Sequence, residues 1–217
     1  MAKYTLTFLR HGESDANLVG IFQGQTNTDL TERGKGQVYK LIQRWQAEGV
    51  QFDAIISSPL ERAHQTAQMI GKALNVPVET DPIWMERDTG KLTGMDRESA
   101  VHSPYFLDFY TPFQAMGGTG EGDFALFIRA GKALDKLLKR PIGQYLIVSH
   151  GGILNQVLRA IIGITPQASG QGVTFRLVNT AFASLTYDPE TFQWTVLVIN
   201  DHAHLKLQDV DASILDL

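Results

Sequence analysis

The chain has 217 residues, a formal net charge of −4 and no cysteine, which suits one α/β domain and excludes thiol catalysis, thiolate metal sites and disulfides. The acidic balance argues against a nucleic-acid partner, because nucleic-acid-binding proteins usually carry a basic surplus. No apolar segment reaches membrane-spanning length and the first residues do not form a signal peptide, so we expect no membrane partner and a cytoplasmic location.

The first predicted element is a strand at residues 4–9, where apolar, β-branched and aromatic side chains follow one another. Arg10 and His11 come directly after it, and Gly12 then lets the backbone turn. Because ligands of open α/β sheets bind just beyond the carboxyl ends of strands, His11 is a candidate nucleophile. An arginine beside it indicates an anionic substrate.

Strand and helix signals then alternate along the first half of the chain. Thr31 is a candidate N-cap, and Pro59 suits the first turn of a later helix, which places Arg62 beyond another strand end. In chain order we predict a loop at 17–29 near His11, a helix between 31 and 49, a strand at 52–57, a helix at 60–74, a short strand at 76–78 and a turn-rich crossing at 84–94.

The second half begins with an irregular stretch at about 95–122, in which aromatic residues precede glycines. A long connection inside a compact domain is usually functional or mobile, so we expect a lid-like excursion from a single domain that spans residues 1–217. We then predict, in order, a helix at 123–139, a strand at 145–148, a helix at 153–162, strands at 174–178, 182–187 and 195–199, and a loosely ordered acidic tail after Leu207.

Charged and imidazole side chains follow three of the predicted strands, namely Arg10 with His11, Arg62, and His150. If these strands are parallel neighbours, the side chains converge on one crevice. Rigid arginine forks and imidazoles suit a tetrahedral dianion better than a metal ion, and Gly151 lets the backbone approach the anion. Phosphoryl transfer, which depends mainly on positioning and electrostatic stabilisation, is the chemistry that fits this arrangement.

For nucleophilic attack His11 must present an unprotonated ring nitrogen, and neighbouring arginines lower its pKa toward that state. We expect attack on phosphorus to form a phosphohistidine. The leaving alkoxide needs a proton, which we assign to Glu86 in a sharp turn, and the same group as a carboxylate then activates water. Glu13, Asp15 and Glu61 compete for this role.

Four ordered motifs resemble those of the histidine phosphatase superfamily, in its phosphoglycerate-mutase-like branch, and the resemblance runs from Leu6 to about Leu205. The motifs are Arg10-His11-Gly12-Glu13 with Ser14 and Asn17, Leu30-Thr31-Glu32-Arg33-Gly34 with Gln37, Ser57-Ser58-Pro59-Leu60-Glu61-Arg62-Ala63 with Thr66-Ala67, and Ser149-His150-Gly151-Gly152. Glu86, with Gly90 and Gly94, matches the segment that carries the family's acid. A lone Arg-His-Gly is a weak signal, whereas four matches in order are specific.

The resemblance implies a three-layer α/β/α sandwich around a mainly parallel sheet, and hydrolysis that needs no metal and no organic cofactor. It implies a small phosphorylated substrate, with His11 phosphorylated and Glu86 as the proton donor. The phosphate pocket would consist of Arg10, Arg62 and His150, and the residues expected to bind substrate around it are Asn17, Gln23, Gly24, Arg87 and Gly151. Monomer and homodimer both stay open.

Two features bear on the choice between phosphatase and mutase. The loop Gly118–Gly122 ends in glycine where family phosphatases often carry serine, so its role stays open. A mutase needs positive charge for a second phosphate, yet between residues 89 and 127 the basic residues apart from histidine are Lys91 and Arg97. The aromatic excursion therefore favours one phosphate on a less charged, more apolar group. A phosphoglycerate mutase and a non-catalytic phosphate-binding module are the alternatives.

Overall fold

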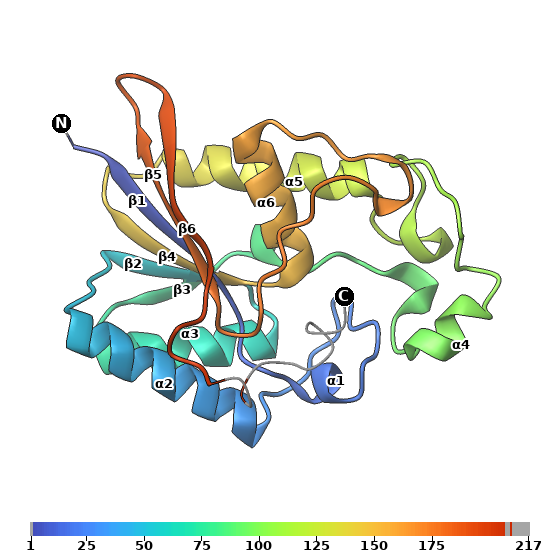
Figure 1. Cartoon of the computed structure of the whole chain (residues 1–217), viewed down its shortest axis with the longest axis horizontal. Helices are drawn as coiled ribbons and strands as arrows, with labels where there is room; N and C mark the ends of the chain where they lie inside the picture. The colour runs from blue at the N-terminus through green and yellow to red at the C-terminus, as the bar shows by residue number, and fades with distance from the viewer. Residues whose placement is uncertain (1, 207–208, 210–217) are drawn as a thin grey trace.

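The computed structural model describes residues 2–206 and 209. Within them, one six-stranded sheet lies between two layers of helices (Figure 1). The strand order across the sheet is β3-β2-β4-β1-β5-β6. The strands are β1 (Tyr4–Arg10), β2 (Ala54–Ser57), β3 (Val78–Thr80), β4 (Gln144–Ser149), β5 (Phe182–Asp188) and β6 (Gln193–Asp201).

The strands that carry the candidate site are parallel neighbours. β1 pairs with β4, β4 with β2 and β2 with β3, all in parallel, whereas β5 is antiparallel to both β1 and β6. In this register Arg10 lies beside Ser149, and Ser57 lies beside Val148. β1, β4 and β2 therefore end at one edge of the sheet, and the residues that follow them meet there.

Helices cover both faces of the sheet (Figure 1). α2 (Glu32–Glu48) and α3 (Glu61–Leu74) pack on one face, and α5 (Asp123–Leu138) and α6 (Gly151–Ile162) pack on the other. Side chains alternate along each strand, so Phe8 of β1 joins the core under α5 and α6 while Leu9 joins the core under α2 and α3. The predicted three-layer α/β/α fold with a mainly parallel sheet is confirmed.

The predicted helix ends agree with the structure where a cap defines them. The Thr31 side chain accepts the N–H of Gly34 at 2.9 Å, as an N-cap does. Gly49 follows α2 in the left-handed region with φ of 67°, which a glycine adopts without steric cost. α6 begins at Gly151, two residues earlier than predicted, so His150 stands directly before the helix N-terminus.

The predicted strand at 174–178 is wrong, because this segment joins no sheet. Its backbone finds side-chain partners instead. The N–H of Phe175 donates to Oδ1 of Asn155 at 2.8 Å, and the N–H of Val178 donates to Oδ1 of Asn200 at 3.0 Å. The apolar residues that resembled a strand reflect burial of a connecting segment against the core.

The excursion at 95–122 contains only short helical pieces, α4 (Arg97–Val101) and the 3-10 turn η3 (Met116–Gly118), and α4 lies away from the sheet (Figure 1). The other short helices are α1 (Asp15–Leu18), η1 (Pro82–Trp84), η2 (Gly90–Leu92) and η4 (Ala168–Gly170). Among the described residues, no helix has the length and apolar character needed to cross a bilayer. The acidic tail predicted after Leu207 lies outside the described residues, apart from Asp209.

Candidate active site

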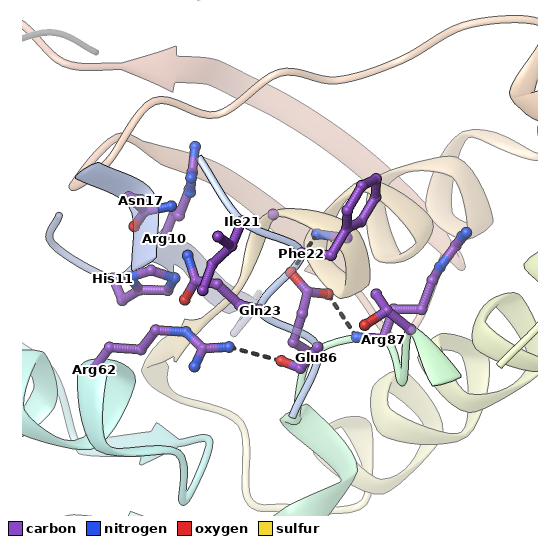
Figure 2. Close-up of a pocket in the computed structure, with 13 residues that line it drawn as sticks. Arg10, His11, Asn17, Ile21, Phe22, Gln23, Arg62, Glu86 and Arg87 are labelled. Carbon is purple, nitrogen blue, oxygen red and sulfur yellow. Dashed lines mark hydrogen bonds between the residues drawn. The ribbon is translucent and has the colours of Figure 1, made fainter. Parts of the chain in front are cut away.

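A cavity of about 270 Å³ opens at the edge where β1 and β4 end (Figure 2). Nine of the predicted site residues line it, from six separate stretches of chain: Arg10, His11, Asn17, Gln23, Gly24, Arg62, Glu86, Arg87 and Gly151. Ile21, Phe22, Thr89 and Gly152 complete the wall. The remaining predicted residue, His150, lies behind His11 instead of in the wall, with the two ring centroids 5.0 Å apart.

The His11 imidazole is buried and uncharged. Its Nδ1 lies 2.7 Å from the carbonyl oxygen of Gly12, and a carbonyl only accepts, so Nδ1 carries the proton and Nε2 keeps its lone pair. Burial, followed by the charges of Arg62 and Arg10, lowers the pKa of His11 well below its usual value of 6.5. Near neutral pH the ring therefore has the protonation state that a nucleophile needs.

His150 is fully buried and meets the His11 ring edge-on. Its Nε2 lies 2.8 Å from Oγ of Ser58, whereas Nδ1 has no hydrogen-bond partner among the described residues. Burial, and then the charge of Arg62, lowers the pKa of His150 well below 6.5. The two histidines thus form a neutral pair, with His11 in the cavity wall and His150 behind it.

Arg10 and Arg62 supply the positive charge of the cavity, since the third arginine of its wall, Arg87, pairs with Asp123. Arg62 is 1% exposed, and it donates to the carbonyl of Thr26 at 2.7 Å and to that of Gly24 at 3.0 Å. Its Nε has no partner among the described residues. Burial lowers the pKa of Arg62 to about 10, which still leaves it charged near neutral pH. Arg10 is held by the carbonyl of Leu177 at 2.8 Å. Guanidinium groups held in place by backbone carbonyls in this way bind an oxyanion strongly.

α1 and the loop that follows it present two amide side chains to the same cavity, Asn17 from the helix and Gln23 from the loop. Oδ1 of Asn17 accepts the N–H of Ser14 at 3.1 Å, and Oε1 of Gln23 accepts the hydroxyls of Ser14 at 3.2 Å and Thr28 at 3.3 Å. Since both side-chain carbonyls are occupied, the amide N–H groups are the donors that remain for an anion. Gly24 also lines the cavity, and its backbone has φ of 51°, a conformation that favours glycine.

Glu86 is the only acid among the described residues that line the cavity. Its Oε2 accepts the N–H of Gly152 at 3.0 Å, and its Oε1 accepts the N–H groups of Ile153 at 3.2 Å and Arg87 at 2.7 Å. The carboxylate therefore lies at the N-terminus of α6, where helix dipole and backbone donors stabilise negative charge.

The three competing acids lie elsewhere. Glu13 pairs with Arg33 at 3.2 Å and accepts the hydroxyl of Thr31 at 2.8 Å, which assigns it to the start of α2. Asp15 and Glu61 do not belong to the cavity wall. Position alone therefore favours Glu86 for proton transfer.

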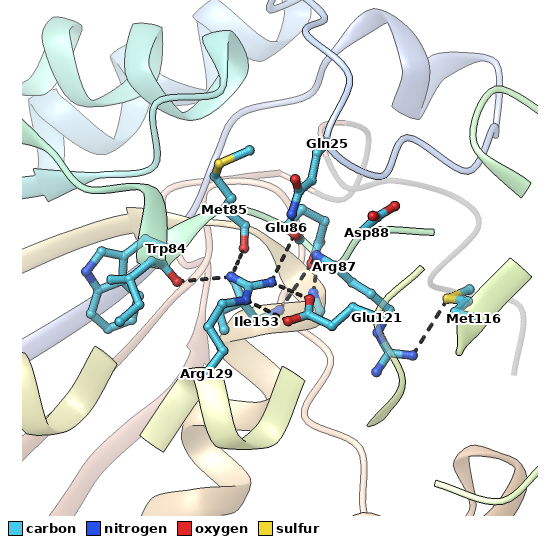
Figure 3. Close-up of polar contacts among 12 residues, drawn as sticks. Gln25, Trp84, Met85, Glu86, Arg87, Asp88, Met116, Glu121, Arg129 and Ile153 are labelled. Atoms are coloured by element: carbon cyan, nitrogen blue, oxygen red, sulfur yellow. Dashed lines mark hydrogen bonds and ion pairs between the residues drawn. The ribbon is translucent and has the colours of Figure 1, made fainter. Parts of the chain in front are cut away.

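Arg129 of α5 fixes the turn that carries Glu86 (Figure 3). Its guanidinium donates to the carbonyls of Ile83 at 3.0 Å, Met85 at 2.6 Å and Glu86 at 3.1 Å. It also forms a two-point ion pair with Glu121, at 2.8 and 2.6 Å. The glycine-rich loop whose role the sequence left open thus supplies the counter-ion of Arg129.

The sequence did not point to Arg129, nor to two residues that hold the backbone of His11 and Gly12. The N–H of Gly12 donates to Oγ1 of Thr66 at 3.1 Å, and Nδ2 of Asn179 donates to the carbonyl of His11 at 3.0 Å. Thr66 was part of a recognised motif, so its role could have been inferred. Arg129 and Asn179 lie in no motif, and only the fold brings them to the site.

We expect Gly152→Ala to reduce activity while the fold persists. A Cβ at this position would overlap Oε1 of Glu86 and lie 3.1 Å from its Cδ, so the carboxylate must move off the α6 N-terminus. A displacement of this size lowers kcat by about 100-fold. The chain still folds, with a thermal midpoint lowered by the lost contacts between Glu86 and the N–H groups of α6. Steady-state kinetics and thermal unfolding measure the two effects, and a folded variant with full activity contradicts this placement of Glu86.

The two buried histidines predict how stability depends on pH. In the unfolded chain His11 and His150 take up protons near pH 6.5, whereas in the folded chain both pKa values are well below this. Below pH 6.5 the unfolded chain binds more protons, so stability is complete above that pH and is lost as pH falls. Burial also lowers the pKa of His204 to about 4, so three histidines contribute to this loss. We expect the free energy of unfolding to drop by about 3 kcal/mol from pH 6.5 to 5.5, about 1 for each of them.

Denaturant titrations across this pH range measure the loss. His150→Gln keeps a hydrogen-bonding group opposite Ser58 and removes one of the three titrating rings, so its decrease is about two thirds that of the wild-type protein. An unchanged pH dependence in this variant contradicts a neutral, buried His150.

One known family matches almost the whole chain. The model of the histidine phosphatase superfamily (branch 1) matches residues 6–202. The chain belongs to this superfamily. A relative from Yersinia enterocolitica, named "Probable phosphoglycerate mutase GpmB", is 31% identical over 214 residues, which cover 94% of this chain and 95% of the relative.

Solved structures of this superfamily share the fold. Bacillus stearothermophilus YhfR is 26% identical with a TM-score of 0.80, and the match covers 94% of this chain and all of that one. A phosphoserine phosphatase from Entamoeba histolytica, in complex with phosphoserine, has a TM-score of 0.74 at 24% identity, covering 94% and 100% of the two chains. The protein is therefore an enzyme of the phosphoglycerate-mutase-type histidine phosphatases.

Proposed function

We propose that this enzyme is a metal-independent phosphomonoester hydrolase that forms a phosphohistidine at His11, with a small phosphorylated metabolite as substrate. The observation that carries the proposal is the state of His11, a buried neutral imidazole whose proton lies on Nδ1, beside two guanidiniums in one cavity. Attack on a phosphate dianion requires an uncharged nucleophile with a free lone pair and a fixed positive charge that stabilises the phosphate oxygens.

In the first step the substrate phosphate lies between Arg10 and Arg62. The lone pair on Nε2 of His11 forms the N–P bond as the ester P–O bond breaks, and the leaving alkoxide takes a proton from the carboxyl group of Glu86. In the second step water gives a proton to the Glu86 carboxylate and its oxygen attacks phosphorus. The N–P bond breaks, its electron pair returns to Nε2, and inorganic phosphate leaves.

The contacts of Glu86 support both halves of this cycle. Its carboxylate accepts three backbone N–H groups, an environment that suits the base of the second step. Glu86 lines the same cavity as His11, so in the first step its carboxyl group is placed to donate a proton to the leaving oxygen.

A mutase is the second candidate. It is favoured by the name of the Yersinia relative and by a cavity that shares Arg10 with the site and is flanked by Arg97 and Arg176. In that case the phosphoryl group of His11 passes to a second hydroxyl of the substrate instead of to water. Acidic side chains in the same wall, Asp96 and Glu98, weigh against a second phosphate there.

The test is phosphate release from a panel of phosphomonoesters in the presence of EDTA, together with interconversion of 3- and 2-phosphoglycerate in the presence of 2,3-bisphosphoglycerate. Release that survives EDTA supports the proposal. Release that requires an added metal ion contradicts metal independence. Interconversion without net release establishes the mutase, and neither activity assigns the site to a non-catalytic phosphate-binding module.

A further inference from the structure

A second cavity, of about 330 Å³, lies under the excursion at 95–122 and beside the phosphate cavity. Much of its wall is apolar or aromatic, including Leu92, Phe106 and Met116. Arg87 lines both cavities, so the two spaces meet at its side chain. Figure 3 shows Arg87 extending from the Glu86 turn toward Met116. A space of this size suits a small organic group.

Close backbone packing sets the position of this second cavity. Gly117 has φ of 57°, and a Cβ there would overlap the carbonyl oxygen of Thr89. The wall that follows α4 is therefore held against the stretch that leads away from Glu86. A group that fills the second cavity lies at a defined position relative to the reacting phosphate.

Asp123 provides an unused acceptor in the wall. It is 5% exposed, and its Oδ1 pairs with the guanidinium of Arg87. Its Oδ2 is buried and has no hydrogen-bond partner among the described residues. Because a buried acceptor without a partner costs free energy, Oδ2 is a site that a donor on a ligand would satisfy.

The charges of the second cavity disfavour another anion. Asp123 already neutralises Arg87, and Asp108 adds a negative charge to the wall. Burial, and then the charge of Asp123, raises the pKa of Tyr110, so this wall residue keeps a neutral hydroxyl. A cationic ligand would in turn meet the guanidinium of Arg87. A neutral group with a hydrogen-bond donor fits all four side chains.

We propose that the second cavity is the leaving-group pocket: it takes the uncharged, largely apolar part of the phosphomonoester and accepts a hydroxyl of that part at Oδ2 of Asp123. This assignment rests on the proposed hydrolase function and adds the substrate class to it. Phe106 supplies apolar contact for the organic group, and Arg87 separates it from the phosphate. The substrate class is thus a phosphorylated alcohol with an apolar body and one further hydroxyl.

A matched set of substrates tests the pocket. It consists of ethyl phosphate, 2-phenylethyl phosphate, the three ring-hydroxylated isomers of the latter, and 3-phosphoglycerate. For wild-type enzyme we expect kcat/KM of the phenylethyl ester to exceed that of ethyl phosphate by about 100-fold, and at least one hydroxylated isomer to gain about another tenfold. Because 3-phosphoglycerate carries a carboxylate as well as its phosphate, we expect its kcat/KM to be lower than that of the aromatic esters.

Variants at Phe106, Phe109 and Asp123 then test whether these substrate preferences arise in the second cavity. Phe106→Ala lowers the preference for the phenylethyl ester over ethyl phosphate by about tenfold, whereas Phe109→Ala, at a position 71% exposed and outside the cavity wall, leaves that preference unchanged. Asp123→Asn must satisfy Arg87 with its amide oxygen, which places an NH2 group where Oδ2 stands. The hydroxyl can then no longer donate at this position, so most of the gain from it is lost. If Asp123→Asn does not fold, the comparison of Phe106→Ala with Phe109→Ala still tests whether the second cavity binds the organic group.

The possible outcomes distinguish a failure of the leaving-group pocket from a failure of the hydrolase function. Hydrolysis of ethyl phosphate or 3-phosphoglycerate with no preference for aromatic esters overturns the leaving-group pocket and leaves the hydrolase standing. Equal effects of Phe106→Ala and Phe109→Ala also overturn it. Failure of wild-type enzyme to release phosphate from any of these esters overturns the hydrolase function and the pocket with it.

Discussion

Replacing His11 by alanine is expected to lower phosphate release by about 10⁴-fold or more, the largest loss at any position in the chain. The variant has no nitrogen at the point where the N–P bond forms, and the positive charge of Arg10 and Arg62 cannot replace a nucleophile. With ³²P-labelled substrate, wild-type enzyme quenched during turnover carries acid-labile label on protein. The alanine variant carries no label. Mass spectrometry of the digested wild-type enzyme places the label on the peptide that contains His11.

The matched control is His102→Ala, which removes an exposed histidine whose ring contacts only the local carbonyl of Glu98 among the described hydrogen bonds. This variant should label and turn over like wild type. Thermal unfolding of both variants separates loss of chemistry from loss of fold. Label that persists in a folded His11→Ala protein assigns the covalent intermediate to another residue.

Much of the fold could be predicted because its signals are local. The apolar run of β1, the Thr31 cap and the glycine after α2 each depend on a few neighbouring residues, and each is found where the pattern placed it. The gathering of Arg10, His11 and Arg62 around one cavity could be predicted for the same reason. The main groups of this cavity directly follow strands, and a parallel register brings strand ends together whatever their separation in sequence.

The features that could not be predicted depend on distant partners. The segment 174–178 has strand-like side chains, yet its backbone bonds to Asn155 and Asn200, and no local pattern encodes that choice. Arg129 looks like one of many polar helix residues until the fold places it under the Glu86 turn. The unpaired Oδ2 of Asp123 is equally invisible in sequence, since Asp123 shares its cavity wall with residues that are distant in the chain.

The second large effect expected is that of Glu86→Gln, which separates substrates by their leaving group. An alkyl phosphate expels a strongly basic alkoxide and needs the proton, so its cleavage slows by about 10³-fold. 4-Nitrophenyl phosphate expels a weakly basic phenolate that needs none, so its first step slows by about tenfold or less. Because glutamine cannot take a proton from water, the second step slows for both substrates.

Rapid mixing makes the two steps visible in one experiment. With 4-nitrophenyl phosphate, Glu86→Gln should release one equivalent of nitrophenolate in a burst, then turn over slowly while the phosphohistidine accumulates; with an alkyl phosphate there is no burst. Glu61→Gln makes the same chemical change at an acid outside the cavity wall and should behave like wild type. Equal losses for both substrate classes in Glu86→Gln, without accumulated phosphoenzyme, would remove Glu86 from proton transfer. Its three contacts with backbone N–H groups would then be structural, holding the turn to the start of α6.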